Sequence, residues 1–309
     1  MKLRSIQVLR AIAACAVVTL HAYDYIDLDS AARVGAAGVD LFFVISGYIM
    51  ATVAADKAPG RFLSDRAWRI LPLWFIAVTP WLLGQHNSPD TIAASVTLWP
   101  VYHDRIILPA LGLGWTLAFE FLFYFGFALA LASRPLVSSM LFALFFVLGF
   151  ATGRALFVYL GNPMALEFLA GVVIAGLPRA RFGLPIMLCG FVWIALGPLE
   201  AGTWMAVSAL AIARVTYWGI GAALVVYGAV SSERLFRGKA WNVPVFLGNA
   251  SYSIYLFHEL AVSHFAWPLN LAAGVALGVA VYLLVEKRLR SVRADVRVLR
   301  QGVAVQPSA

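Results

Sequence analysis

Apolar residues run along most of this chain in stretches of helical length, separated by short segments that hold most of the charges. The stretches cover residues 6–22, 35–54, 70–84, 115–132, 136–150, 163–177, 183–197, 209–230, 244–262 and 268–285. A membrane-crossing helix needs about 20 mainly apolar residues, and several stretches approach that length. The pattern predicts an all-α protein, a polytopic transmembrane bundle of about ten helices.

The composition agrees with a membrane protein. Hydrophobic residues make up 62% of the chain and charged residues 12%, against about 45–50% and about 25% in soluble proteins. The core of a soluble protein cannot bury this excess of hydrophobic residues. The first apolar stretch follows Lys2 and Arg4, as in a signal peptide, but no small-residue cleavage site follows His21, so we expect a retained helix.

The basic residues are divided unequally between the two sides of the predicted bundle. Ten helices place both termini on one side, and of the 23 Lys and Arg residues the other side then holds Arg33, Arg105, Arg154 and Arg214. Cytoplasmic loops carry the excess of Lys and Arg, so both termini are expected in the cytoplasm. We therefore predict a transmembrane domain over residues 1–285 and a basic cytoplasmic tail over residues 286–309.

The first apolar stretch carries two ionisable residues, Arg10 and His21. Eleven residues turn a helix about 20° past three full turns, so both side chains share a face, roughly 16 Å apart. Ionisable residues inside membrane segments are costly and usually functional. The shared face favours a polar path through the bundle. The alternatives are an arginine that reaches the inner headgroups and a histidine at the outer interface.

The second stretch contains Asp40 and the small pair Ser46-Gly47. A carboxylate inside the membrane needs a partner, and His21 or an arginine is available. Small residues allow close approach of another helix or of a ligand, and the sequence leaves both interpretations of Ser46-Gly47 open.

Two further carboxylates begin later stretches. Glu120 lies about one turn into its helix, with Tyr124 four residues further on. Such a group is protonated, paired or in water. Glu167 follows Asn162-Pro163, a typical helix start, and we expect it to pair with Arg154 across the outer turn.

Arg66 and Arg69 flank Trp68 just before the third stretch. Three residues apart on a helix, the two guanidinium groups point the same way. Positive-inside anchoring is one interpretation of the pair. The other is a phosphate-bearing ligand at the cytoplasmic mouth, because guanidinium groups bind phosphate bidentately.

Near the C-terminus, Ser251, Tyr255 and His258 form a polar stripe at helical spacing. A hydrogen-bonded helix contact and the lining of a wet cavity explain it equally well. Cys15 and Cys189 lie far apart and provide no zinc-ligand spacing, so no metal is expected. Serine-hydrolase, ATPase and zinc-protease motifs are absent from the sequence.

Several of these segments, taken in order, resemble the acyltransferase-3 family of integral membrane acyltransferases. The matching features are the R-x10-H pattern from Arg10 to His21, GVDLFFVISGYIM, the RxxR pair with RILP, WTLAFEFLFY and LGNASYSIYLFH. Through GWTL and NPMALEFLAG the chain is most similar to the exopolysaccharide O-acetyltransferases of the succinoglycan and xanthan type. It differs from the family pattern at Glu286-Lys287-Arg288, where a Glu-x-Pro is common.

The resemblance implies transfer of an acetyl group from cytoplasmic acetyl-CoA to a hydroxyl of an exported or surface polysaccharide, or of its lipid-linked precursor, at the bacterial inner membrane. The roles it implies are catalytic for Arg10, His21 and Glu120, acyl-CoA binding for Arg66 and Arg69, and substrate binding for Asp40, Ser46, Trp115, Tyr255 and His258. Acetyl-CoA is then a co-substrate, and other polysaccharide-assembly proteins are candidate partners.

We expect His21 to deprotonate the acceptor hydroxyl, because a neutral imidazole is suited to proton transfer near neutral pH. A covalent acetyl-histidine relay is the main variant of this mechanism. Two other functions compete with catalysis. One is a flippase or exporter for a lipid-linked glycan, and the other is a purely structural partner in a polysaccharide assembly complex.

Overall fold

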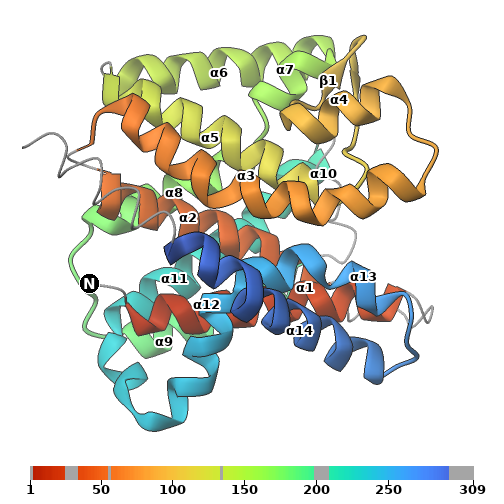
Figure 1. The fold of residues 1–309 in the computed structure, drawn as a ribbon. Coiled ribbons are helices and arrows are strands. Elements are labelled where there is room, and N and C mark those ends of the chain that lie inside the picture. The colour runs from red at the N-terminus through yellow and green to blue at the C-terminus, as the bar shows by residue number, and fades with distance from the viewer. Residues whose placement is uncertain (1–2, 25–33, 55–56, 133–134, 198–208, 292–309) are drawn as a thin grey trace, which may run out of the picture.

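The computed structural model describes residues 3–24, 34–54, 57–132, 135–197 and 209–291 (Figure 1). Within them the fold is a bundle of helices with one small hairpin. The long N-terminal helices are α1 (Arg4–Asp24), α2 (Ala37–Ala54) and α3 (Pro59–Gly84). The remaining helices are α4 (Pro89–Thr97), α5 (Gly114–Ala132), α6 (Pro135–Thr152), α7 (Ala155–Leu160), α8 (Ala165–Gly176), α9 (Gly183–Ala195), α10 (Ala209–Arg214), α11 (Ile220–Ser231), α12 (Asn242–Phe257), α13 (Glu259–Val262) and α14 (Leu269–Val281).

Short irregular elements join or extend these helices. Two are π-helical, η2 (Val215–Gly219) between α10 and α11 and η5 (Tyr282–Glu286) after α14. Two are 3-10 turns, η3 (Glu233–Arg237) and η4 (Lys239–Trp241). The hairpin pairs β1 (Val101–Tyr102) with β2 (Arg105–Ile106) in antiparallel register.

The predicted fold class is confirmed for the described residues, which are mainly helical. Seven helical segments there are long and apolar enough to cross a membrane: Arg4–Tyr23, Val34–Val53, Pro59–Gly84, Gly114–Ala132, Ala155–Gly176, Ala211–Ser231 and Leu269–Ser291. The chain is therefore a multi-pass membrane protein. The number of crossings and the cytoplasmic position of the termini stay predictions.

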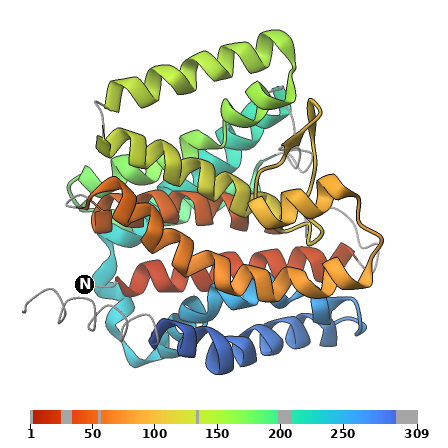
Figure 2. The ribbon, with the colours of Figure 1, turned by 45° about the horizontal axis from the view of Figure 1, so that its top comes forward.

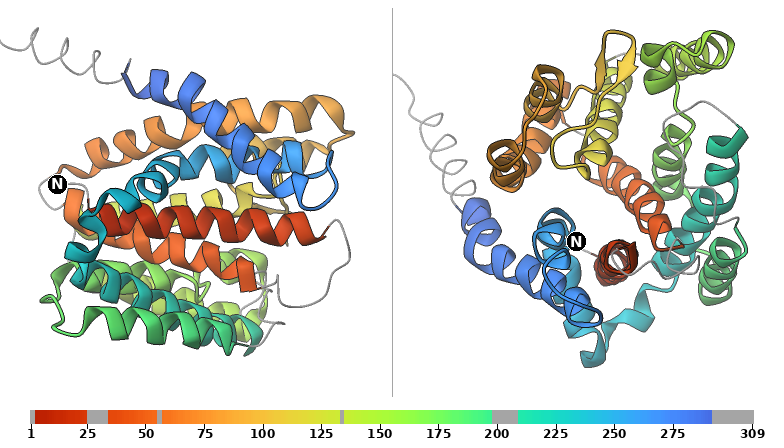
Figure 3. Two further views of the ribbon diagram at one scale, coloured as in Figure 1. Left: turned by 90° about the horizontal axis from the view of Figure 1, so that it is seen from below. Right: turned by 90° about the vertical axis from the view of Figure 1, so that its right-hand side faces the viewer.

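Helix α1 lies in the middle of the bundle. It packs against α12 and α14 on one side and against α2 and α11 on the other (Figure 3, right). Helix α6 lies at the edge and contacts α5 and α7 (Figures 1 and 2). Because α1 carries both Arg10 and His21, its central place buries Arg10 and leaves His21 partly buried.

The crossing of α2 and α8 depends on two glycines. A Cβ at Gly47 would lie 2.0 Å from the carbonyl oxygen of Phe168, and a Cβ at Gly171 would lie 2.0 Å from that of Val44. Neither contact is sterically possible, so only glycine permits this approach of the two backbones. Of the two interpretations of Ser46-Gly47, the tight helix crossing holds for Gly47.

Three segment boundaries differ from the prediction. Helix α3 begins at Pro59, ahead of the predicted apolar stretch 70–84, so Arg66 and Arg69 lie well inside the helix and not at its start. The segment between the predicted stretches 70–84 and 115–132 contains α4 and the hairpin. The last helical segment continues to Ser291, five residues past the start of the predicted tail at Glu286, and the rest of that tail lies outside the described residues.

Candidate functional site

A pocket with about 760 Å³ of empty space, part of it open to solvent, lies where α1, α2, α3, α5 and α12 meet. Its lining includes most of the predicted site residues, namely Arg10, Ser46, Arg66, Arg69, Glu120 and Tyr255. The remaining ones, His21, Asp40, Trp115 and His258, do not line it. We call it the arginine pocket. Residues far apart in sequence therefore converge at one place.

Charge in the arginine pocket is unbalanced. The guanidinium groups of Arg10, Arg66 and Arg69 face it, and Glu120 contributes the one carboxylate among its lining residues. Arg10 and Arg66 are buried, at 9% and 7% exposure. Buried charges need partners, and among the lining residues one carboxylate faces three guanidinium groups.

The guanidinium of Arg66 has an unused donor. Its Nε is buried and has no hydrogen-bond partner among the described residues. Its plane packs near the rings of Phe62 and Tyr124, at 5.5 and 5.9 Å from the two centroids. Most buried polar groups are satisfied, so this donor points to a ligand. Arg10, in contrast, donates from Nε to Oγ of Ser251 across 3.1 Å.

Glu120 is held by two hydroxyl groups. Ser46 Oγ donates to its Oε1 across 2.9 Å, and Tyr124 OH donates to the same oxygen across 2.5 Å. Two donors on one oxygen stabilise the charged carboxylate. The predicted i,i+4 relation of Glu120 and Tyr124 is therefore a hydrogen bond, and Ser46, the other half of the Ser46-Gly47 pair, lines the pocket.

Arg69 also borders a second pocket. That pocket is lined by Trp68, Arg69, Pro72, Leu73, Glu286, Leu289 and Arg290. Glu286 is buried, accepts from Ser253 Oγ across 2.5 Å and pairs with Arg290. Glu286 has no role in the sequence-based prediction, although a carboxylate four residues before Arg290 on a helix is a signal for such a pair.

The polar stripe of α12 is divided between two environments. Ser251 and Tyr255 line the arginine pocket, and the Tyr255 hydroxyl lies 2.9 Å from the Thr116 hydroxyl at its end. His258, one turn further on, instead meets His21, with His21 Nδ1 at 2.8 Å from its Nε2. The stripe is thus both a cavity lining and a helix contact, and the pocket reaches to within one helical turn of the two histidines.

Asp40 and Trp115 take part in packing. Asp40 accepts two hydrogen bonds from Arg214, from Nε across 3.0 Å and from Nη2 across 2.7 Å, and both residues are at most 2% exposed. An arginine partner for Asp40 was among the expectations. Arg214, which the topology assigns to the outer side of the membrane, has its guanidinium buried in this pair, and its side of the membrane stays a prediction. Trp115 packs edge-on against Phe43 and Phe119.

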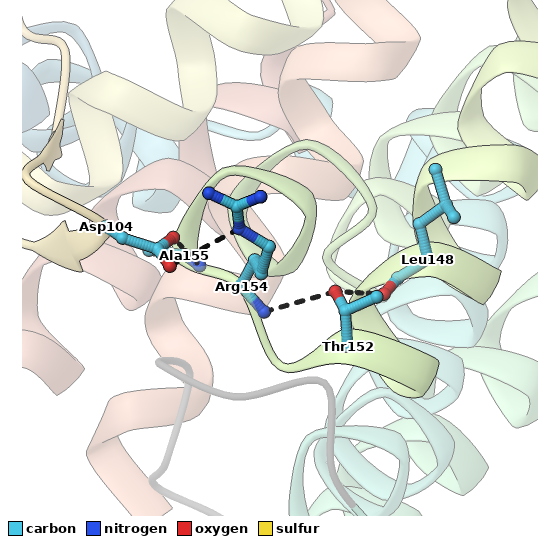
Figure 4. A network of polar contacts seen from close by, with 5 residues as sticks. All are labelled: Asp104, Leu148, Thr152, Arg154 and Ala155. Atoms are coloured by element: carbon cyan, nitrogen blue, oxygen red, sulfur yellow. Dashed lines mark hydrogen bonds and ion pairs between the residues drawn. The ribbon is translucent and has the colours of Figure 1, made fainter.

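The expected ion pair between Glu167 and Arg154 is wrong. Arg154 pairs with Asp104 of the hairpin, Nε to Oδ2 at 3.4 Å, and Asp104 also accepts from the backbone N–H of Ala155 (Figure 4). Glu167 is buried on α8 and faces Asp40. Asp104, in the hairpin turn, takes the place of Glu167 as the partner of Arg154. Sequence spacing could not reveal that contact, because the two residues are far apart along the chain.

Metal binding has no visible site. Among the described residues, no group of three or more His, Cys, Asp or Glu side chains is arranged to hold a metal ion.

Comparison with known proteins identifies a family. A family model described as an acyltransferase domain matches residues 3–285. An exopolysaccharide production protein, ExoZ of Rhizobium meliloti (strain 1021), is 32% identical over 294 residues, which cover 83% of this chain and 90% of that protein. No solved structure matches the chain.

Proposed function

This chain belongs to the acyltransferase domain family, and on that premise we propose that it is a membrane O-acetyltransferase. It moves an acetyl group from cytoplasmic acetyl-CoA to a hydroxyl of an exopolysaccharide or of its lipid-linked precursor, in the bacterial inner membrane. Family membership and the similarity to an exopolysaccharide production protein support an acyltransferase acting in exopolysaccharide production. The acetyl group, the CoA donor and the hydroxyl acceptor belong to the proposal.

The arginine pocket is the proposed donor site, and the unsatisfied Nε of Arg66 is the observation that carries this assignment. CoA carries a diphosphate and a further phosphate, and guanidinium groups bind phosphate oxygens through paired N–H donors. Arg66 and Arg69 lie near the N-terminal end of α3 and Arg10 near that of α1. With the N-terminus in the cytoplasm, this end of the pocket faces the cytoplasmic donor.

The residues that line the pocket support a path for the thioester. The lining includes Arg69 as well as Thr116 and Tyr255, and Tyr255 precedes His258 by one helical turn. The pantetheine arm of CoA is long, narrow and largely uncharged. With the phosphates at the arginines, the arm extends along the pocket towards His21, which is paired with His258.

His21 is the proposed general base. Its imidazole takes the proton from the acceptor hydroxyl, and the oxygen attacks the carbonyl carbon of the thioester. A carbon–oxygen bond forms and the carbon–sulfur bond breaks. The sulfur leaves as a thiolate and takes the proton back from the imidazolium. The products are the O-acetyl ester and CoA thiol. In the relay variant, the imidazole nitrogen attacks the thioester first, so that a carbon–nitrogen bond forms as the carbon–sulfur bond breaks. The acceptor oxygen then attacks the acetyl-imidazole, a carbon–oxygen bond forms as the carbon–nitrogen bond breaks, and the hydroxyl proton passes to the CoA thiolate.

Glu120 is proposed to orient the donor-binding arginines. Its carboxylate acts electrostatically on both Arg10 and Arg66, and Ser46 and Tyr124 fix its position. A fixed carboxylate keeps two cationic side chains aimed into the pocket before the donor arrives. Preorganisation of this kind removes an ordering cost from binding.

The test uses membranes that contain the full chain, acetyl-CoA labelled in the acetyl group, and exopolysaccharide or lipid-linked glycan as acceptor. We expect label in the glycan, and no label with His21→Ala at an equal protein level. Full activity of His21→Ala would overturn the role of His21. Translocation of glycan without label would support the flippase instead.

A further inference from the structure

His21 and His258 meet edge to edge where α1 faces the junction of α12 and α13. Their ring planes differ by 14°, the centroids are 5.0 Å apart, and the nearest nitrogens are 2.8 Å apart. Nearly coplanar rings with nitrogens this close share an in-plane hydrogen bond, because the short contact joins ring edges and not ring faces. The direction of this bond decides which nitrogen of His21 carries a proton.

A backbone carbonyl sets that direction. Nδ1 of His258 lies 3.1 Å from the carbonyl oxygen of Ile254, and a carbonyl oxygen only accepts, so Nδ1 of His258 carries the hydrogen. His258 has no exposed surface, and burying a charged imidazole is costly, so the ring is neutral and its Nε2 accepts. His21 therefore donates from Nδ1, and the lone pair of the neutral His21 ring is on Nε2.

We propose that His258 is a positioning residue that holds His21 in the Nδ1–H tautomer and so directs the Nε2 lone pair of His21 to the acceptor hydroxyl. The inference rests on the proposed function, since it concerns the base of that reaction. His258 acts through His21 alone, because its own Nε2 is engaged and its side chain is fully buried.

The surroundings of His258 hold it in one place. A Cβ at Gly274 of α14 would lie 3.2 Å from the Cβ of His258, so α14 packs closely over it. Asn270, one turn earlier on α14, donates from Nδ2 to the carbonyl oxygen of Ala22 across 2.9 Å. Ala22 follows His21 directly, so the helix that covers His258 is also fixed to the backbone beside His21. The two rings thus keep their relative position.

Two amide substitutions separate the contacts of His258. In His258→Gln the side-chain oxygen reaches the position of Nε2 and accepts from His21. In His258→Asn the amide nitrogen reaches the position of Nδ1 and donates to Ile254, but His21 loses its acceptor. We expect His258→Asn to lower kcat about 100-fold, at the lower end of what a general base contributes. His258→Gln should stay within about tenfold of the parent protein.

The KM for acetyl-CoA should be unchanged in both variants, because neither substitution touches the arginine pocket. An unchanged KM also shows that both variants fold. Equal kcat values for Gln and Asn, or a rise in KM with unchanged kcat, would overturn the inference. His21→Ala separates a failure of the positioning role of His258 from a failure of the base role of His21. If His21→Ala is inactive while His258→Asn is fully active, only the positioning role fails. If His21→Ala is active, the proposed base itself fails.

Nitrogen NMR of protein labelled with ¹⁵N-histidine gives a readout that does not depend on turnover. The chain has five histidines, and the spectrum of His21→Ala identifies the His21 signals by their loss. We expect a protonated Nδ1 and an unprotonated Nε2 for His21, and a change towards a mixture of tautomers in His258→Asn. A His21 ring protonated at Nε2 in the unmodified protein would contradict the inference.

Discussion

Arg10 on α1 donates to Ser251 on α12, and the same two helices meet again where His21 contacts His258. Arg10 and His21 are eleven residues apart, and Ser251 and His258 are seven apart. Both spacings return to nearly the same face of a helix. The packing of one pair of helices therefore fixes Arg10, at the proposed donor site, and His21, the proposed base, relative to each other.

Arg66→Ala should weaken donor binding. A hydrogen bond to a charged group contributes about 1.5–3 kcal/mol, so the KM for acetyl-CoA should rise about tenfold or more. Initial rates at varied labelled acetyl-CoA and constant acceptor measure this. The matched control is Arg61→Ala, because Arg61 is exposed on the same helix and does not line the pocket. An equal rise in both variants would show that the arginine pocket is not the donor site.

Glu120→Gln should lower kcat/KM about tenfold or more, because the amide keeps the size of the side chain but removes the charge that faces Arg10 and Arg66. Tyr124→Phe removes one hydrogen bond to that carboxylate, worth about 1 kcal/mol, and should cost about fivefold. Steady-state kinetics of both variants check that Glu120→Gln loses more kcat/KM than Tyr124→Phe. A larger loss in Tyr124→Phe would contradict the orienting role of Glu120.

Asp40→Ala should destabilise the protein by about 3–5 kcal/mol, because it removes the carboxylate that accepts two hydrogen bonds from the buried guanidinium of Arg214. The double variant Asp40→Leu with Arg214→Met removes both charges and should recover most of that stability. Thermal unfolding of the detergent-solubilised chain measures both. The double variant also tests the predicted substrate-binding role of Asp40, since a stable but inactive protein would support that role and a stable, active one would refute it.

Gly47→Ala should destabilise the crossing of α2 and α8 by about 1–3 kcal/mol, the usual cost of overpacking. The added methyl group would meet the backbone carbonyl of Phe168, which cannot rotate away. Gly60→Ala is the control, since no atom lies within 4 Å of a Cβ at that position on α3. An unchanged melting temperature for Gly47→Ala would mean that the two helices cross less tightly than the structure indicates.

Much of the helical framework follows from local pattern. The apolar stretches predicted α1, α2 and α5 closely, because hydrophobic residues in runs of about 20 favour membrane helices whatever surrounds them. The start of α3 was missed because residues 59–69 are too polar to extend an apolar stretch, although Pro59 at the first helical position is a helix-start signal. Polar first turns are the part of a membrane helix that hydropathy does not reveal.

Contacts between residues of one helix follow from their spacing. Glu120 and Tyr124 contact each other because the helix repeat alone brings them together. Pairs between helices were not predictable in the same way. Sequence spacing suggested Glu167 as the partner of Arg154, but Arg154 pairs with Asp104 in the turn between β1 and β2. Asp40 required a cation, but its partner Arg214 lies 174 residues further on.

By itself, the sequence determined that this chain is a helical, multi-pass membrane protein of the acyltransferase family and that Arg10 and His21 share one face of the first helix. Those properties depend on composition, on the helix repeat and on short motifs, all of which are local. Only the tertiary structure decided that Arg10, Arg66, Arg69 and Glu120 surround one pocket and that His21 is paired with His258. These contacts depend on which helices are neighbours and at what depth they cross, and packing over the whole bundle determines both.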